Sequence, residues 1–256
     1  MIGLDGMVVL VTQGEGAFSP GIAEALAERG ATVGALVATD EGGADFVARV
    51  AACGGRAHAV VSGVLDSARL QAALDEISTT LGPIGAVVHN AASTVPRPPG
   101  PEHLGQPRQE QWADHLMVAL RGLYWLGHLL HGALADEGGS IVVVTSNDAI
   151  EGDEDVPLFS AAKGAQRAMM RSLAREWGRD GIRLNCIGPI AMTPELERAM
   201  AADPTLYDRI TPQIALGRWG DPRTDIGPAV AYLCSSEARF VTGQTLLVNG
   251  GRYTAL

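Results

Sequence analysis

Seven short apolar segments alternate along the chain with segments of helical periodicity, and this alternation restricts the possible folds more than any other feature. The apolar segments are residues 7–11, 32–37, 57–61, 86–90, 141–145, 183–187 and 245–248. Runs that are apolar on both faces are typical of strands covered on both sides. Their alternation with helices predicts a parallel sheet between two helical layers.

The helical segments continue this pattern along the whole chain. They are predicted at residues 20–29, 44–52, 66–81, 111–134, 158–178 and 225–234, with shorter helical pieces over 193–215. Five prolines make residues 93–107 a loop, which stays within the spacing of one strand and helix unit. We therefore predict one α/β domain over residues 1–256, a Rossmann-like, doubly wound parallel sheet of about seven strands in a three-layer αβα arrangement.

The charge balance restricts the partners. The formal net charge is −10, and an acidic surface repels nucleic-acid phosphates and anionic lipids. We expect no nucleic-acid partner and no membrane association. No basic and apolar leader begins the sequence, and no apolar run approaches the ~20 residues that span a bilayer. A cytoplasmic location is the corresponding expectation.

Cysteine and histidine spacings argue against a metal site. Cys53, Cys186 and Cys234 stand at no metal-ligand spacing, and we interpret them as small buried side chains in a reducing compartment. His128 and His131 lie one helical turn apart without a third ligand nearby in sequence. We expect this pair to pack at a surface or an interface, and we predict no metal.

Residues 146–163 form the stretch most suited to catalysis. Ser146 follows an apolar run, and the spacing of Phe159 and Lys163 places both on one face of a helix. This stretch resembles the short-chain dehydrogenase/reductase family, in which a serine, a tyrosine and a lysine stand at this spacing. There the tyrosine exchanges a proton with the substrate oxygen while a nicotinamide exchanges the hydride. Phe159 takes the position of that tyrosine, and a phenyl ring carries no transferable proton.

The resemblance extends over essentially the whole chain. Residues 185–190 resemble the family's N-A-x-x-P-G segment, with proline and glycine exchanged and a residue missing. Residues 216–222 and 240–245 look like the corresponding segments of 3-oxoacyl thioester reductases, and residues 249–251 complete the family's ending. Family members bind NAD or NADP and usually form tetramers by pairing two long central helices and the last strand. The second of these helices offers an apolar surface for such pairing. Its residues are Ala165, Ala168, Met169, Leu173 and Trp177.

The glycine-rich turn of the family departs from its pattern here. Aligned without gaps, the family's T-G-x-x-x-G-I-G falls on residues 12–19, and its three glycines become Gln13, Ala17 and Ser19. Glu15 would bring a carboxylate beside a diphosphate, so it would have to be neutralised or moved away. A shifted alignment through Gly14, Gly16 and Ser19 resembles the wider G-x-G-x-x-G pattern. The alternative is a tight glycine-bearing turn without a ligand.

Other positions that would contact the cofactor have also lost the residues typical of the family. Val37 replaces the acidic residue that would hold the adenosine ribose, although Asp40 is close enough to substitute. Gly63 replaces the aspartate expected at adenine. The N-N-A-G signature reads as residues 89–92, which keep Asn90 and lose the glycine. His89 is either a proton carrier or a packed, hydrogen-bonded residue.

The catalytic set is also reduced. The family's asparagine, which holds a proton-relay water, aligns with Ala119, so Ser146 and Lys163 are what remains of the set. Neither residue need be catalytic. Ser146 could instead be a locally hydrogen-bonded residue at a strand end, and Lys163 a helix residue paired with an acid. Asp148 or Glu151, in an acidic run, could serve as a base with Lys163 as its cationic partner, or could simply belong to a solvated surface.

These departures lead to three functional hypotheses. The leading one is a non-catalytic subunit that binds no cofactor itself and pairs with a catalytically complete homologue in a heteromeric dehydrogenase of acyl thioesters. A homotetramer is the alternative assembly. The second hypothesis is an active NAD- or NADP-dependent alcohol dehydrogenase or ketoreductase with an atypical proton relay. The third is a cofactor-independent lyase or dehalogenase-like enzyme, although related dehalogenases keep the tyrosine and replace the lysine by arginine.

Overall fold

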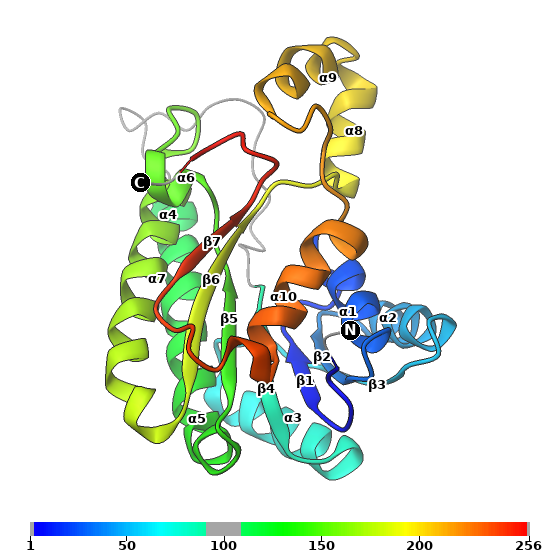
Figure 1. The fold of residues 1–256 in the computed structure, drawn as a ribbon, viewed down its shortest axis with the longest axis vertical. Coiled ribbons are helices and arrows are strands. Elements are labelled where there is room, and N and C mark those ends of the chain that lie inside the picture. The colour runs from blue at the N-terminus through cyan, green and yellow to red at the C-terminus, as the bar shows by residue number, and fades with distance from the viewer. Residues whose placement is uncertain (1–2, 91–108, 255–256) are drawn as a thin grey trace.

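A computed structural model describes residues 3–90 and 109–254 of the chain. Its seven parallel strands form one sheet in the order β3-β2-β1-β4-β5-β6-β7, so the predicted doubly wound sheet is confirmed (Figure 1). The strands are β1 Val8–Val11, β2 Thr32–Val37, β3 Arg56–Val61, β4 Ile84–His89, β5 Ser140–Val144, β6 Arg183–Pro189 and β7 Thr245–Val248. The strand order reverses between β1 and β4, and ligands of such folds bind beyond the carboxyl ends of the strands at this point.

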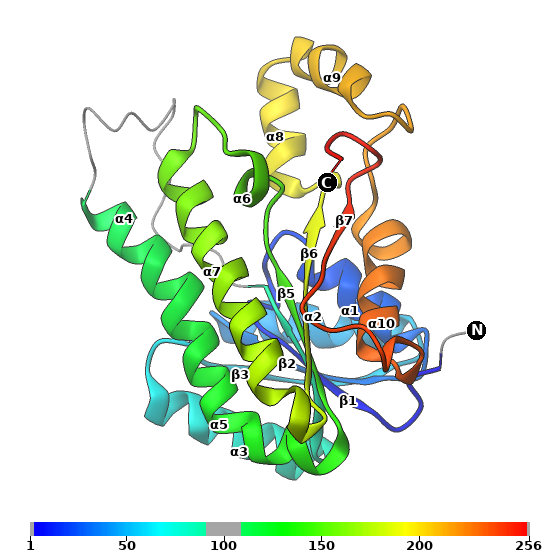
Figure 2. The same cartoon turned by 60° about the vertical axis from the view of Figure 1, so that its left-hand side comes forward.

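The helices cover the two faces of the sheet separately (Figure 2). One face carries α1 (Ser19–Ala27), α2 (Asp40–Ala52) and α10 (Gly227–Cys234), and the other carries α3 (Ser67–Leu81), α5 (Gly122–Glu137) and α7 (Pro157–Glu176). Successive residues of β5 show why both layers are needed. Val142 and Val144 join one apolar core, whereas Ile141 and Val143 join the other.

One predicted helix differs clearly from the structure. The helix expected over residues 111–134 is interrupted, because α4 (Gln109–Leu116) passes into a π-helical turn at Met117–Arg121 before α5 begins. The acidic run after β5 begins with the short helix α6 (Asp148–Glu151). The short helical pieces expected over residues 193–215 are confirmed as α8 (Pro194–Ala202) and α9 (Thr205–Ile210), which lie beyond the carboxyl ends of the strands (Figure 1).

Some sequence predictions concern the chain as a whole. The proline-rich loop at residues 93–107 lies outside the described residues.

Cys186 and Cys234 are buried and Cys53 is half-buried, so the expected burial holds for two of the three. Burial raises the pKa of Cys186 and that of Cys234 to about 12, which keeps both thiols protonated. Within the described part of the chain, every helix is too short or too polar to cross a membrane.

Candidate functional site

Lys163 and Phe159 meet beneath the carboxyl end of β5. Both lie on α7, and the Lys163 Nζ atom is 5.8 Å from the centre of the Phe159 ring, so the prediction of a shared helix face is confirmed. The ammonium donates hydrogen bonds to the carbonyl of Val144 (3.2 Å) and to Gln166 Oε1 (3.4 Å). Burial lowers the pKa of Lys163 to about 8. At this position the lysine faces an aromatic ring that has no proton to exchange.

Gln166 is one residue of the site that the sequence did not single out. Its side chain is fully buried, and its Nε2 atom donates to the carbonyl of Ala119 (3.0 Å) while Oε1 accepts from Lys163. The π-helical turn that contains Ala119 presents this carbonyl to Gln166. Gln166 therefore bridges Lys163 and the position of the family's relay asparagine. The available signal was a polar side chain one helical turn beyond Lys163.

Ser146 forms a local hydrogen-bonded turn with Asp148. Its Oγ atom donates to Asp148 Oδ2 (2.8 Å), and the backbone amide of Asp148 donates to Ser146 Oγ (3.3 Å). This geometry agrees with the interpretation of Ser146 as a locally hydrogen-bonded residue at a strand end. The pairing of Asp148 or Glu151 with Lys163 as a catalytic base and cation remains a prediction.

His115 is a second residue that the sequence did not single out. It lies on α4, and its ring meets the Phe159 ring edge to face with centroids 5.7 Å apart. The sequence separation of 44 residues hides this proximity, because it depends on the packing of α4 against α7. An imidazole can both donate and accept a proton, so His115 brings a titratable group to the position that lacks the phenol.

The first turn after β1 keeps the backbone shape of a glycine turn without its first glycine. Gln13 has a φ of +47° and is the only non-glycine residue with positive φ in the described ranges. This conformation supports the ungapped alignment, in which Gln13 takes the place of the first signature glycine. Gly16 turns back on Gln13, and a Cβ atom at Gly16 would lie 3.0 Å from the Gln13 carbonyl oxygen.

Replacing Gln13 by glycine is expected to make the protein more stable than the matched Gln13→Ala variant by about 1 kcal/mol. Both variants lose the glutamine side chain, but only glycine adopts positive φ without a steric penalty. Urea unfolding of the two variants measures the difference. Equal stability of Gln13→Gly and Gln13→Ala would show that the backbone at residue 13 is unstrained.

The remaining positions of the motif are tied to β4. Asn90 donates from Nδ2 to Ser19 Oγ (2.8 Å) and from its backbone amide to Thr12 Oγ1 (3.0 Å). Ser19 Oγ in turn donates to the carbonyl of Thr12 (3.4 Å). Asn90 and Ser19 therefore hold the β1–α1 turn against the end of β4. Ala17 lies at the edge of a hollow of about 550 Å³ beside α1.

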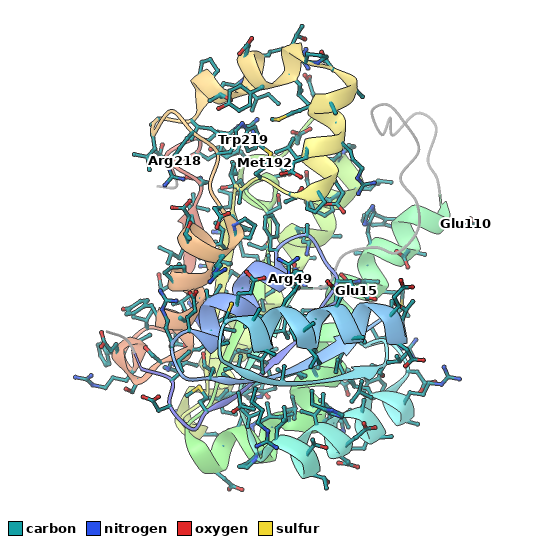
Figure 3. The ribbon with its side chains drawn as sticks, turned by 90° about the vertical axis from the view of Figure 1, so that its right-hand side faces the viewer. Glu15, Arg49, Glu110, Met192, Arg218 and Trp219 are labelled. Atoms are coloured by element: carbon teal, nitrogen blue, oxygen red, sulfur yellow. The ribbon has the colours of Figure 1, made fainter. Side chains whose placement is uncertain are left out.

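Glu15 turns away from the first turn and reaches the start of α2. Its carboxylate accepts hydrogen bonds from the amide of Ala38 (2.7 Å) and the hydroxyl of Thr39 (2.9 Å). The expectation that a carboxylate here would have to move away is consistent with this geometry, and Figure 3 shows Glu15 beside α2. Asp40, considered as a substitute ribose ligand, is the exposed first residue of α2.

His89 is a packed residue in the closed interior. It is fully buried, its Nδ1 atom lies 3.3 Å from Thr12 Oγ1, and its Nε2 atom has no hydrogen-bond partner among the residues the structure describes. Burial, with a smaller effect from the charge of Lys163, lowers the pKa of His89 to about 3. The imidazole is therefore neutral at physiological pH, which favours packing over proton transport.

The histidines of α5 lie at the surface of this helix. His131 bonds through Nε2 to Asp180 Oδ2 (3.2 Å) and meets the Trp177 ring edge to face, while His128 stacks on Tyr124. In residues 3–90 and 109–254, no group of three metal-ligating side chains is close enough to hold an ion. The predicted surface packing of the two histidines agrees with these contacts.

Comparison with known proteins relates the whole chain to reductases. Residues 16–253 match a family model described as Enoyl-(Acyl carrier protein) reductase. The chain is 32% identical to a 3-oxoacyl-(acyl-carrier-protein) reductase of Vibrio harveyi over 98% of both chains, and 33% identical to an acetoacetyl-CoA reductase of Synechocystis sp. over 99% of both. A 7α-hydroxysteroid dehydrogenase, solved with NADH and 7-oxo glycochenodeoxycholic acid, is similar with a TM-score of 0.87 at 26% identity, over 98% of this chain and 95% of that one.

Proposed function

Because this chain belongs to the short-chain dehydrogenase/reductase family, we propose that it is a subunit that does not transfer hydride by itself. In this proposal it pairs with a catalytically complete homologue in a heteromeric dehydrogenase of acyl thioesters. The named activities of its relatives, on 3-oxoacyl carrier-protein and acetoacetyl-CoA substrates, suggest that class of substrate for the assembly.

The contact between Lys163 and Phe159 is the observation that carries this proposal. The lysine of the family acts beside a phenol, and here it lies beside a phenyl ring at 5.8 Å. A positioned acid or base contributes roughly 10²–10⁴ to a rate, which corresponds to about 3–5 kcal/mol of barrier. The hydrogen bonds of Lys163 to Val144 and Gln166 further engage its ammonium within the protein.

The outer surface of α5 and α7 offers a place for a partner. A hollow of about 580 Å³ lies over the two helices, lined by Tyr124, His128, Met169 and Leu173 among others. Tyr124 is 50% exposed, although it is a large side chain suited to burial in an interface. The predicted apolar face is only partly available, because Trp177 is buried within the chain's own core. Family members pair through these helices, so a homologue is the partner that fits this surface.

Two measurements test the proposal. The chain is expressed alone and together with a homologue from the same genome that has the tyrosine and the glycine turn. We expect the pair to purify together and to turn over acetoacetyl-CoA with NADH or NADPH, and we expect the isolated chain to show no turnover. An isolated homotetramer that reduces acetoacetyl-CoA at a rate comparable to that of the pair would overturn the proposal.

The contact between His115 and Phe159 favours one second candidate, an active reductase with an atypical proton relay. In that case the imidazole, 5.7 Å from the phenyl ring, would supply the proton that residue 159 lacks. The two candidates make opposite predictions for the isolated chain. Turnover that His115→Asn abolishes would favour the reductase, whereas no turnover in either form favours the non-catalytic subunit.

A further inference from the structure

We propose that Glu15 closes, from within the chain, the corner that would receive the adenosine half of a dinucleotide. In a doubly wound fold the diphosphate lies at the β1–α1 turn and the adenosine ribose at the end of β2. The backbone of Glu15 lies in the β1–α1 turn, and its carboxylate reaches the end of β2. The inference rests on the proposed function, because a subunit that transfers no hydride has no need of an open nucleotide site.

The carboxylate of Glu15 is fixed by donors from the end of β2. It accepts from the amide of Ala38 at 2.7 Å and from the hydroxyl of Thr39 at 2.9 Å. It also packs directly on the backbone of Gly42, where a Cβ atom would lie 1.7 Å from Glu15 Oε1. Gly42 therefore leaves the space that the carboxylate occupies in the first turn of α2.

A second contact holds the turn in the same place. The amide of Gly14 donates to the carbonyl of Leu36 at 2.8 Å. A Cβ atom at Gly14 would lie 3.0 Å from Val37 and 3.1 Å from Phe46, so the backbone of residue 14 packs closely on β2 and α2. The β1–α1 turn is thus tied to the β2–α2 corner by a backbone hydrogen bond and by the Glu15 side chain.

Two physical effects then act against an adenosine phosphate. The nucleotide would have to displace the carboxylate, which would remove the acceptor from Ala38 and Thr39. Its phosphates would also approach the negative charge of Glu15. Asp40 and Glu41, exposed in the first turn of α2, add a weaker, solvent-screened repulsion. A ligand without a phosphate avoids the second effect and keeps only the first.

The experiment compares the binding of ADP, the phosphate-bearing half of a dinucleotide, to wild-type protein and to Glu15→Ser by isothermal titration calorimetry. Serine removes the spanning side chain and its charge. We expect Glu15→Ser to bind ADP at least about tenfold more tightly than wild type, which corresponds to ~1.4 kcal/mol. Because the bonds of Glu15 lie at an exposed position, we expect the melting temperature to change little.

Two further variants separate occupancy from charge. Glu41→Ser removes a neighbouring charge from the first turn of α2. We expect this substitution to change ADP affinity less than about twofold. Glu15→Gln keeps most of the side-chain volume, so it should gain less affinity than Glu15→Ser. Equal gains for Glu41→Ser and Glu15→Ser would overturn the proposal in favour of a general charge effect.

The outcomes also distinguish this inference from the proposed function. Failure of both wild type and Glu15→Ser to bind ADP would overturn closure by Glu15 and leave the proposed subunit role standing. Tight ADP or NADH binding by wild type that weakens in Glu15→Ser would show that Glu15 is a ribose ligand, which also overturns closure. The subunit role itself is decided by turnover of the isolated chain.

Discussion

Acidification from pH 6.5 to pH 3 is expected to lower the free energy of unfolding by roughly 4–5 kcal/mol through His89 alone. The imidazole is fully buried at the end of β4, and burial is the main reason that its pKa falls from 6.5 to about 3. Below pH 6.5 the unfolded chain takes up a proton that the folded chain accepts only near pH 3. This contribution to stability is therefore complete above pH 6.5 and is lost progressively as the pH falls to 3.

Urea unfolding at several pH values between 7 and 4 measures this effect. The informative comparison is His89→Asn, which places the asparagine of the family motif at this position and does not titrate. Its stability should fall less steeply with acid than that of wild type. His58→Asn is the matched control, because His58 pairs with Glu76 at the surface. Parallel curves for wild type and His89→Asn would contradict the burial argument.

Replacing Gln166 by leucine is expected to lower the free energy of unfolding by about 3 kcal/mol. Leucine has a similar volume, so the expected loss of stability comes from the broken hydrogen bonds. The carbonyl of Ala119 loses its donor at 3.0 Å, and the ammonium of Lys163 loses an acceptor at 3.4 Å, both in the closed interior. A buried group left without its partner costs about 1–3 kcal/mol, and more when the group is charged.

Gln71→Leu provides the control for this substitution. Gln71 also lies on a helix and donates to a neighbouring side chain, Asp75 Oδ1 at 2.8 Å, but at an exposed position. Its replacement should change stability by less than about 0.5 kcal/mol. A similar small loss for Gln166→Leu, measured by urea unfolding, would show that the bridge to Ala119 and Lys163 contributes nothing to the fold.

His89 and Gln166 both lie in the interior near Lys163. In the family, the interior beside the lysine carries a relay of protons to the site. Here Gln166 connects Lys163 to Ala119 through its own side-chain atoms, and His89 is neutral and buried nearby. The ammonium of Lys163 and the amide of Gln166 are held by hydrogen bonds inside the protein, an arrangement that stabilises the interior. These fixed hydrogen bonds are consistent with the proposal of a subunit that does not transfer hydride by itself.

The sequence predicted the fold closely because burial on both faces of a parallel sheet leaves a pattern that is readable along the chain. Residues 245–248 were predicted as the last strand, and β7 has these bounds. The prediction was wrong within the long helix after residue 109, where the π-helical turn at Met117–Arg121 packs against α7 and leaves no periodic signal in the sequence.

The candidate site could be predicted only where its residues are neighbours in sequence. Phe159 and Lys163 are one helical turn apart, so their contact follows from helix geometry. Gln166 was missed because its partner Ala119 is 47 residues away, and His115 because it meets Phe159 only when α4 packs on α7. Such contacts are set by the arrangement of helices in space.

The sequence by itself determined the strand and helix order, the acidic charge and the absence of a phenol at residue 159, since these are properties of residue type and spacing. Only the tertiary structure decided where Glu15 and Lys163 direct their charges. Both side chains are long, and the positions of Ala38, Thr39, Val144 and Gln166 fix their charged groups. A flexible charged side chain follows the nearest hydrogen-bond partners, and the folded chain alone brings those partners within reach.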